Sequence, residues 1–172
     1  MNPNPQFLLL CGLAGLMALA VVSDLQSHRI PNALTALGLV AALALQGATG
    51  GWAGLGDAAL GALLAFAIFF PFHLGRGMGA GDVKLATAAG AFLTPAGALL
   101  GSAVALIAGG ACALLWLLVR RLASSGMPAN AVDGAAGGRP VARHGRFPYA
   151  IAIAVGMLFA ATQSGSGGSV GP

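Results

Sequence analysis

The stretch that decides the fold runs from Leu85 to Val119 and reads LATAAGAFLTPAGALLGSAVALIAGGACALLWLLV. It contains no charged residue, and its apolar character is interrupted at residues 94–97, Thr-Pro-Ala-Gly. A helix that crosses a bilayer needs about 20 apolar residues. The stretch is longer than one crossing needs, and the break at residues 94–97 divides it into two apolar segments.

The rest of the chain has the same character. Of its 172 residues, 58% are hydrophobic and 7% are charged, whereas about 25% are charged in a soluble domain. Four further apolar segments occur, at about residues 7–22, 33–48, 58–74 and 147–162. The sequence thus predicts an all-α, polytopic membrane protein with six transmembrane helices. We expect residues 1–163 to form this domain and the Gly/Ser-rich tail 164–172 to be disordered.

The basic residues predict the orientation. They fall in alternate loops: Arg29 after the first segment, Arg76 and Lys84 after the third, and Arg120, Arg121, Arg139, Arg143 and Arg146 after the fifth. Loops rich in Lys and Arg are cytoplasmic, so both termini are predicted on the non-cytoplasmic side. The net charge of +4 then reflects topology and contact with lipid headgroups, and we expect no nucleic-acid partner.

The chain has no Glu, and its only acidic residues are Asp24, Asp57, Asp82 and Asp133. Asp24 follows the first apolar segment and Asp82 precedes the fourth, so the predicted topology places both at the cytoplasmic face. Two close carboxylates at a membrane boundary cannot both ionise cheaply, and the pair can hold one proton. The ionised member can then activate a water while the protonated member polarises an amide. Either aspartate can take either role, and no metal or cofactor is needed.

The other candidate site residues flank these aspartates: Gly79, Gly81, Lys84, Arg29, Pro31 and Asn32. The two glycines fit a tight turn or the close approach of a substrate strand, or simply a loop at the membrane edge. The two basic side chains either stabilise a carboxylate, contact substrate or anchor the topology. Pro31 and Asn32 are expected to shape the turn into the second helix. Asp57 is expected to cap a helix.

Three segments resemble motifs of bacterial prepilin peptidases, which are GxGD intramembrane aspartic proteases. They are DLQSHRIPN at 24–32, GAGDVKL at 79–85 and FPYAIAIAVG at 147–156. The resemblance implies that Asp24 and Asp82 are the catalytic aspartates. It also implies removal of the short basic leader of type IV prepilins or pseudopilins, at the cytoplasmic face of the bacterial inner membrane.

The chain departs from the larger members of that family in its cysteines. Those members carry a cytoplasmic insert with paired CxxC motifs and also N-methylate the new pilin terminus. Here Cys11 and Cys112 stand alone in apolar segments. The chain resembles the short, peptidase-only form associated with Flp (tight-adherence) pili, and no methyltransferase activity is expected.

Two other functions use the same residues. An aspartic protease of this type could cleave other membrane helices, and a small transporter or assembly scaffold could use the pair as a proton site. The acids gather toward one face and no internal repeat is visible, which favours the peptidase over the transporter. The sequence carries no signal for the oligomeric state.

Overall fold

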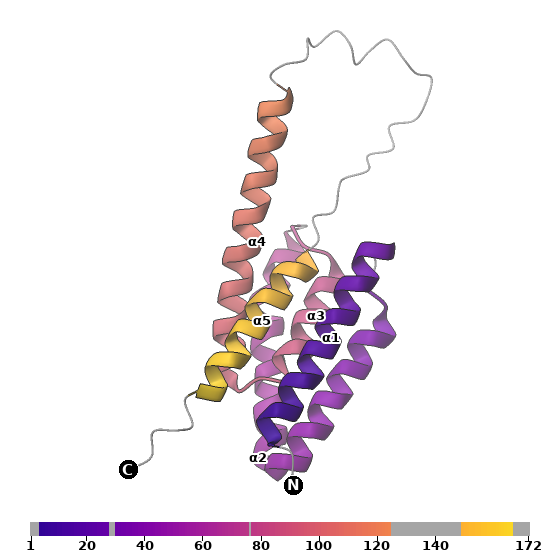
Figure 1. The fold of residues 1–172 in the computed structure, drawn as a ribbon, viewed down its shortest axis with the longest axis vertical. Coiled ribbons are helices and arrows are strands. Elements are labelled where there is room, and N and C mark those ends of the chain that lie inside the picture. Colours follow the sequence, from indigo (N-terminus) through magenta and orange to yellow (C-terminus); the bar gives the residue numbers. More distant parts are fainter. Residues whose placement is uncertain (1–3, 28–29, 76, 125–148, 167–172) are drawn as a thin grey trace.

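The computed structural model describes residues 4–27, 30–75, 77–124 and 149–166. Five helices account for almost all of this part of the chain (Figure 1). They are α1 (Pro5–Ser27), α2 (Asn32–Leu74), α3 (Ala80–Gly90), α4 (Pro95–Ser124) and α5 (Tyr149–Ser166). The prediction of an all-α protein is confirmed.

Helix α2 doubles back on itself at Gly51, so it contains two of the predicted membrane segments. Gly51 has φ 59° and ψ −140°, a conformation that is essentially restricted to glycine. Beyond this turn the chain returns along itself, because Gly54 lies against the backbone of Gln46 and Gly47 faces Leu55. The first half of α2, residues 32–50, and its second half, residues 52–74, are therefore antiparallel neighbours.

Helix α3 is short. Its 11 residues span about 16 Å, whereas the hydrocarbon core of a bilayer is about 30 Å thick. Within the part of the chain that the structure describes, three helices are long and apolar enough to cross a membrane, namely Pro5–Ser27, Asn32–Leu74 and Pro95–Leu115. All six predicted apolar segments contain a helix, but α3 has the length of a re-entrant segment, and six full crossings stay a prediction.

Small residues let the helices pack closely. The buried core includes many alanines, among them Ala42, Ala65 and Ala89. The backbones of Gly61 in α2 and Gly90 in α3 touch, as is common between helices in membranes, where small residues replace bulky core side chains. The first and second halves of α2 and helix α3 thus form one closely packed unit.

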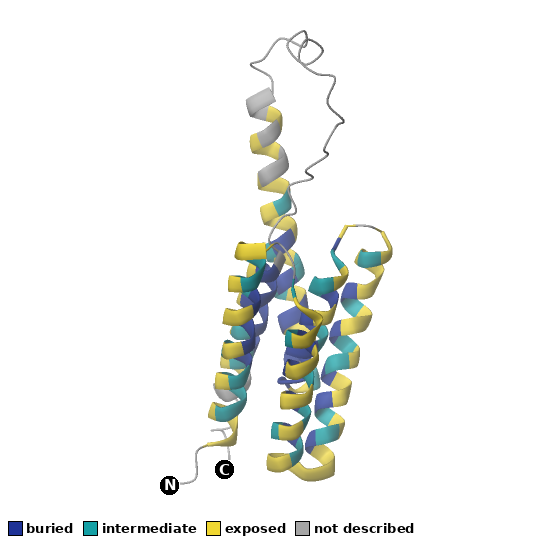
Figure 2. Cartoon of the chain, turned by 90° about the vertical axis from the view of Figure 1, so that its right-hand side faces the viewer, coloured by how far each residue is buried: buried dark blue, intermediate teal, exposed yellow. Residues whose placement is uncertain are grey.

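The outer surface of the bundle is apolar. Side chains such as Leu37, Leu63 and Ile107 are more than half exposed, while the buried residues gather between the helices (Figure 2). An exposed surface of large apolar side chains is unfavourable in water and suits contact with lipid. The chain is a membrane protein.

The helices of the bundle begin and end at two opposite ends (Figure 1). We call the end with Asp24, Asn32, Leu74 and Asp82 the aspartate end. The opposite end, with the start of α1, the Gly51 turn and the end of α5, is called the hairpin end. Since α1 starts and α5 ends at the hairpin end, the arrangement fits an even number of crossings. Which side of the membrane the hairpin end faces stays a prediction.

Candidate active site

Asp24 lies in the last turn of α1. The helix continues past it to Ser27, whose hydroxyl donates a hydrogen bond to the carbonyl of Ser23 (2.8 Å). Asp24 is half-buried. Its carboxylate is thus carried by a regular helix rather than by a loop, which fixes its height in the bundle.

Asp82 lies in the first turn of α3. Gly79 is the N-cap of this helix, with extended backbone angles, and its carbonyl accepts hydrogen bonds from the backbone N–H groups of Asp82 (3.1 Å) and Val83 (3.4 Å). The Asp82 carboxylate folds back over the helix start, because its Oδ2 lies 3.0 Å from the position that a Cβ on Gly79 would take. A negative charge is favourable there, at the positive end of the helix dipole. Asp82 is half-buried.

Two contacts join the segment after Asp24 to the segment around Asp82. The Nζ of Lys84 donates a hydrogen bond to the Oδ1 of Asn32 (2.9 Å). Gly81 faces Ile30, whose Cβ lies 3.5 Å from the position of a Cβ on Gly81. The two motifs, which are about 50 residues apart in the sequence, thus meet at the aspartate end.

The remaining predicted site residues are placed as follows. Pro31 is the N-cap of α2 and Asn32 is the first residue of that helix, so both do form the turn into the second apolar segment. Arg29 lies outside the described residues. The prediction that Asp57 caps a helix is wrong: the second half of α2 begins just after Gly51, and Asp57 lies inside it. Asp133 also lies outside the described residues.

Gln46, which belongs to none of the sequence motifs, is buried in the first half of α2. Its Nε2 donates hydrogen bonds to the carbonyls of Ala91 (3.0 Å) and Leu93 (3.4 Å), just beyond the end of α3. Inside a bilayer, backbone carbonyls that leave a helix need a donor from the protein. A lone amide in an apolar segment is the sequence signal that points to such a role.

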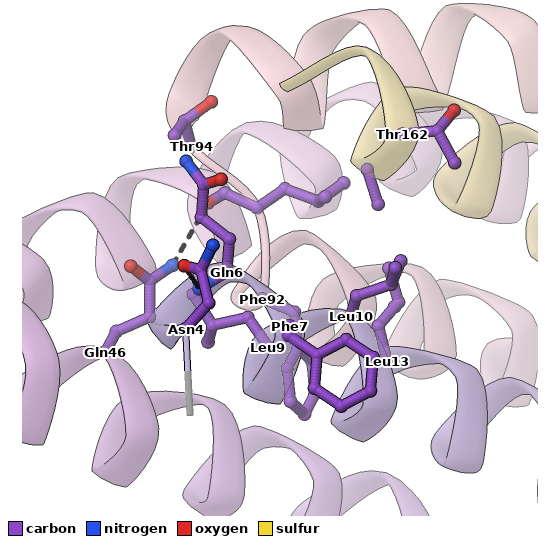
Figure 3. A pocket seen from close by; sticks show the side chains of 12 residues that line it. Asn4, Gln6, Phe7, Leu9, Leu10, Leu13, Gln46, Phe92, Thr94 and Thr162 are labelled. Atoms are coloured by element: carbon purple, nitrogen blue, oxygen red, sulfur yellow. Dashed lines mark hydrogen bonds between the residues drawn. The ribbon is translucent and has the colours of Figure 1, made fainter. Parts of the chain in front are cut away.

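A cavity of about 420 Å³ opens at the hairpin end (Figure 3). Its lining consists of apolar, amide and hydroxyl side chains: Asn4, Gln6, Phe7, Leu9, Leu10, Leu13, Gln46, Phe92, Leu93, Thr94, Ala161 and Thr162. None of these side chains can donate or accept a proton near neutral pH. Although this is a large cavity, it lacks the acid and base that hydrolysis requires, and the aspartate end is the better candidate for chemistry.

The aspartate end combines two carboxylates from different helices with a glycine-rich segment that leads into α3. Glycines at positions 77, 79 and 81 alternate with Met78 and Ala80 in this segment, and glycine permits close approach of another backbone. Within the described part of the chain, no three His, Cys, Asp or Glu residues gather in a group that could hold a metal ion.

A family model described as the type IV leader peptidase family matches residues 11–114, which extend from α1 into α4 and include both aspartate motifs. Neither the curated proteins nor the solved structures contain a match.

Proposed function

Because the chain belongs to the type IV leader peptidase family, we propose that it is a membrane-embedded aspartic endopeptidase with Asp24 and Asp82 as its catalytic pair. Its substrates are type IV prepilins or pseudopilins, from which it removes the leader peptide. The observation that carries this proposal is the contact between the two motifs, made by the 2.9 Å hydrogen bond from Lys84 to Asn32. It holds the start of α3 beside the start of α2, at the same end of the bundle as Asp24.

The reaction needs only a water and the two carboxyl groups. The ionised carboxylate accepts a proton from the water as the water oxygen attacks the carbonyl carbon of the scissile bond. The protonated carboxyl group donates a hydrogen bond to the carbonyl oxygen, where negative charge develops. When the tetrahedral intermediate collapses, the C–N bond breaks and the leaving amine takes a proton from the carboxyl group that received it.

The position of the pair matches the substrate. A prepilin has a basic leader followed by an apolar helix, so its cleavage site lies at a membrane surface. Both aspartates are at one end of the bundle and half-buried, where a peptide segment leaving the membrane can reach them. We assign this end to the cytoplasmic face of the bacterial inner membrane, since all Lys and Arg residues fall in the loops predicted on that side.

The proposed substrate class rests on the resemblance to the short, peptidase-only form of the family. The sequence has only Cys11 and Cys112 and no CxxC pair, so we assign it peptidase activity without methyltransferase activity. Flp-type prepilins of the tight-adherence class are the proposed substrates.

The test uses purified protein in liposomes with an Flp-type prepilin. Asp24→Asn and Asp82→Asn should each lower kcat/KM by at least about 100-fold, because general acid–base groups contribute about 10²–10⁴. Asp57→Asn is the matched control, because this residue lies far from the aspartate end in the second half of α2, and it should cleave at the rate of the parent protein. Normal cleavage by either of the first two variants would refute the dyad. Preferential cleavage of unrelated transmembrane helices would refute the substrate class.

A further inference from the structure

Helix α3 is attached to the first half of α2 at both of its ends. At the aspartate end, the Nζ of Lys84, which follows the first turn of α3, donates a hydrogen bond to the Oδ1 of Asn32 (2.9 Å). At the other end, Gln46 donates hydrogen bonds to the carbonyls of Ala91 and Leu93. Asn32 and Gln46 thus belong to one continuous helical half, and together they hold the whole length of α3.

This attachment affects the position of Asp82 because α3 is short. With 11 residues, it cannot be fixed by reaching both membrane surfaces, as a spanning helix is. Its depth and rotation depend on its neighbours, and it packs mainly against α2. Any shift of α3 moves Asp82, while Asp24 stays on α1.

Close packing contributes to this position. The contact between Gly61 and Gly90 brings the second half of α2 and α3 together, and buried side chains such as Val83 and Leu85 limit the rotation of α3. Hydrogen bonds add defined directions and lengths. The two polar contacts therefore restrict the depth and rotation of α3 further, one at each of its ends.

We propose that Asn32 and Gln46 are positioning residues that hold α3 at its two ends and thereby hold Asp82 in register with Asp24. This inference rests on the proposed function, in which the two aspartates act as a pair. Neither residue touches the reacting atoms. Asn32 acts through Lys84, and Gln46 acts through the backbone beyond the end of α3.

A double-mutant cycle tests the contact at the aspartate end. Asn32→Ala and Lys84→Met should each lower kcat by about 10- to 100-fold, because small misplacements of catalytic groups have effects of this size, and KM should stay within about twofold. The double variant should be no worse than either single variant. Asn32→Asp keeps the acceptor oxygen and should restore most of the activity. Multiplicative losses, or losses in KM alone, would mean that the two side chains contact substrate separately, and would overturn the proposal.

Variants of Gln46 test the other end. Gln46→Leu removes both donors, and kcat should fall by about 10- to 100-fold. Gln46→Glu retains one donor in its neutral form, which burial in a membrane favours, so its kcat should lie between those of the parent and Gln46→Leu. Thr49→Val is the matched control, because the exposed Thr49 hydroxyl bonds only to carbonyls of its own helix. Equal loss in Gln46→Glu and Gln46→Leu would overturn the role of the donor.

A distance between α1 and α3, measured by spin labelling, distinguishes a shift of α3 from a loss of activity with another cause and from a failure to fold. Spin labels at Leu25→Cys and Ala80→Cys, with Cys11 and Cys112 replaced by Ser, report the distance between the end of α1 and the start of α3. Asn32→Ala and Gln46→Leu should shift or broaden this distance distribution, whereas Asp82→Asn should leave it unchanged.

An unchanged distribution in both positioning variants would overturn the proposal. Since this readout needs no proteolysis, it decides the positioning even if the parent protein cleaves no prepilin, an outcome that would refute only the proposed function.

Discussion

The Asp82 carboxylate packs closely against Gly79. A Cβ on Gly79 would lie 3.0 Å from the Asp82 Oδ2, closer than an ordinary carbon–oxygen contact. The backbone angles of Gly79, φ −69° and ψ 146°, suit any residue, so a substitution there displaces the carboxylate without straining the backbone.

Gly79→Ala should therefore lower kcat by about 10-fold or more while the thermal stability changes little. Gly81→Ala is the matched comparison, because a Cβ there would make an ordinary 3.5 Å contact with Ile30, and we expect a smaller loss of activity. Measuring kcat and the melting temperature of both variants distinguishes the effects. Equal activity of Gly79→Ala and the parent protein would show that the carboxylate does not need its present position.

At the residue level, the sequence predicts the aspartates as the catalytic pair but not the contacts that join their motifs. Asp24 and Asp82 stand out because acids are rare in this chain and their neighbours form motifs. The partnership of Lys84 with Asn32 spans 52 residues and depends on how α2 and α3 pack. Neither hydrophobicity nor spacing encodes such a pair, so the sequence alone does not predict the hydrogen bond between Lys84 and Asn32.

The crossing of α2 and α3 depends on glycine on both sides. A Cβ on Gly61 would overlap the backbone carbonyl of Gly90, and a backbone, unlike a flexible side chain, cannot move aside. Gly61→Ala should force the helices apart and destabilise the fold by about 1–3 kcal/mol, with loss of activity.

Gly56→Ala provides the control for that substitution. Nothing lies within 4 Å of a Cβ at this position in the same half of α2, so its thermal unfolding should match that of the parent protein. Equal unfolding temperatures for Gly61→Ala and Gly56→Ala would contradict the close approach of the two helices.

The turn within α2 makes a second prediction for this element. Gly51 has the only positive φ among the described glycines, and a residue with a side chain in that region costs about 1–3 kcal/mol. Gly51→Ala should lower the free energy of unfolding by that amount, as measured by denaturant or thermal unfolding in detergent. Gly50→Ala, where nothing lies near a Cβ, should have a much smaller effect.

Hydrophobicity located all the helical segments but not the length of α3. Helix α3 starts at Ala80, before the uncharged stretch from Leu85 to Val119, and ends at Gly90, inside that stretch. The apolar pattern marks neither of these bounds. The end at Gly90 coincides with the backbone contact to Gly61 and the hydrogen bonds from Gln46. Both partners come from α2, so tertiary packing contributes to where α3 ends, ahead of the break that residues 94–97 predict.

For the whole molecule, the charge pattern predicts which end faces the cytoplasm. A single cysteine introduced at Gln26, at the aspartate end, in a background without Cys11 and Cys112, should be protected in intact cells from a membrane-impermeant thiol reagent. One introduced at Gly50, at the hairpin end, should be labelled. The reverse pattern would place the aspartates outside and contradict cleavage at the cytoplasmic face.

The central claim is that Asp24 and Asp82 together remove the leader of a prepilin. It is tested most directly by mass spectrometry of the N-terminus of an Flp-type prepilin co-expressed with the parent protein or with its Asp82→Asn variant. We predict a pilin without its leader and without an N-terminal methyl group in the first case, and the full-length prepilin in the second, with equal amounts of both proteins in the membrane. Leader removal by the Asp82→Asn variant would contradict the account.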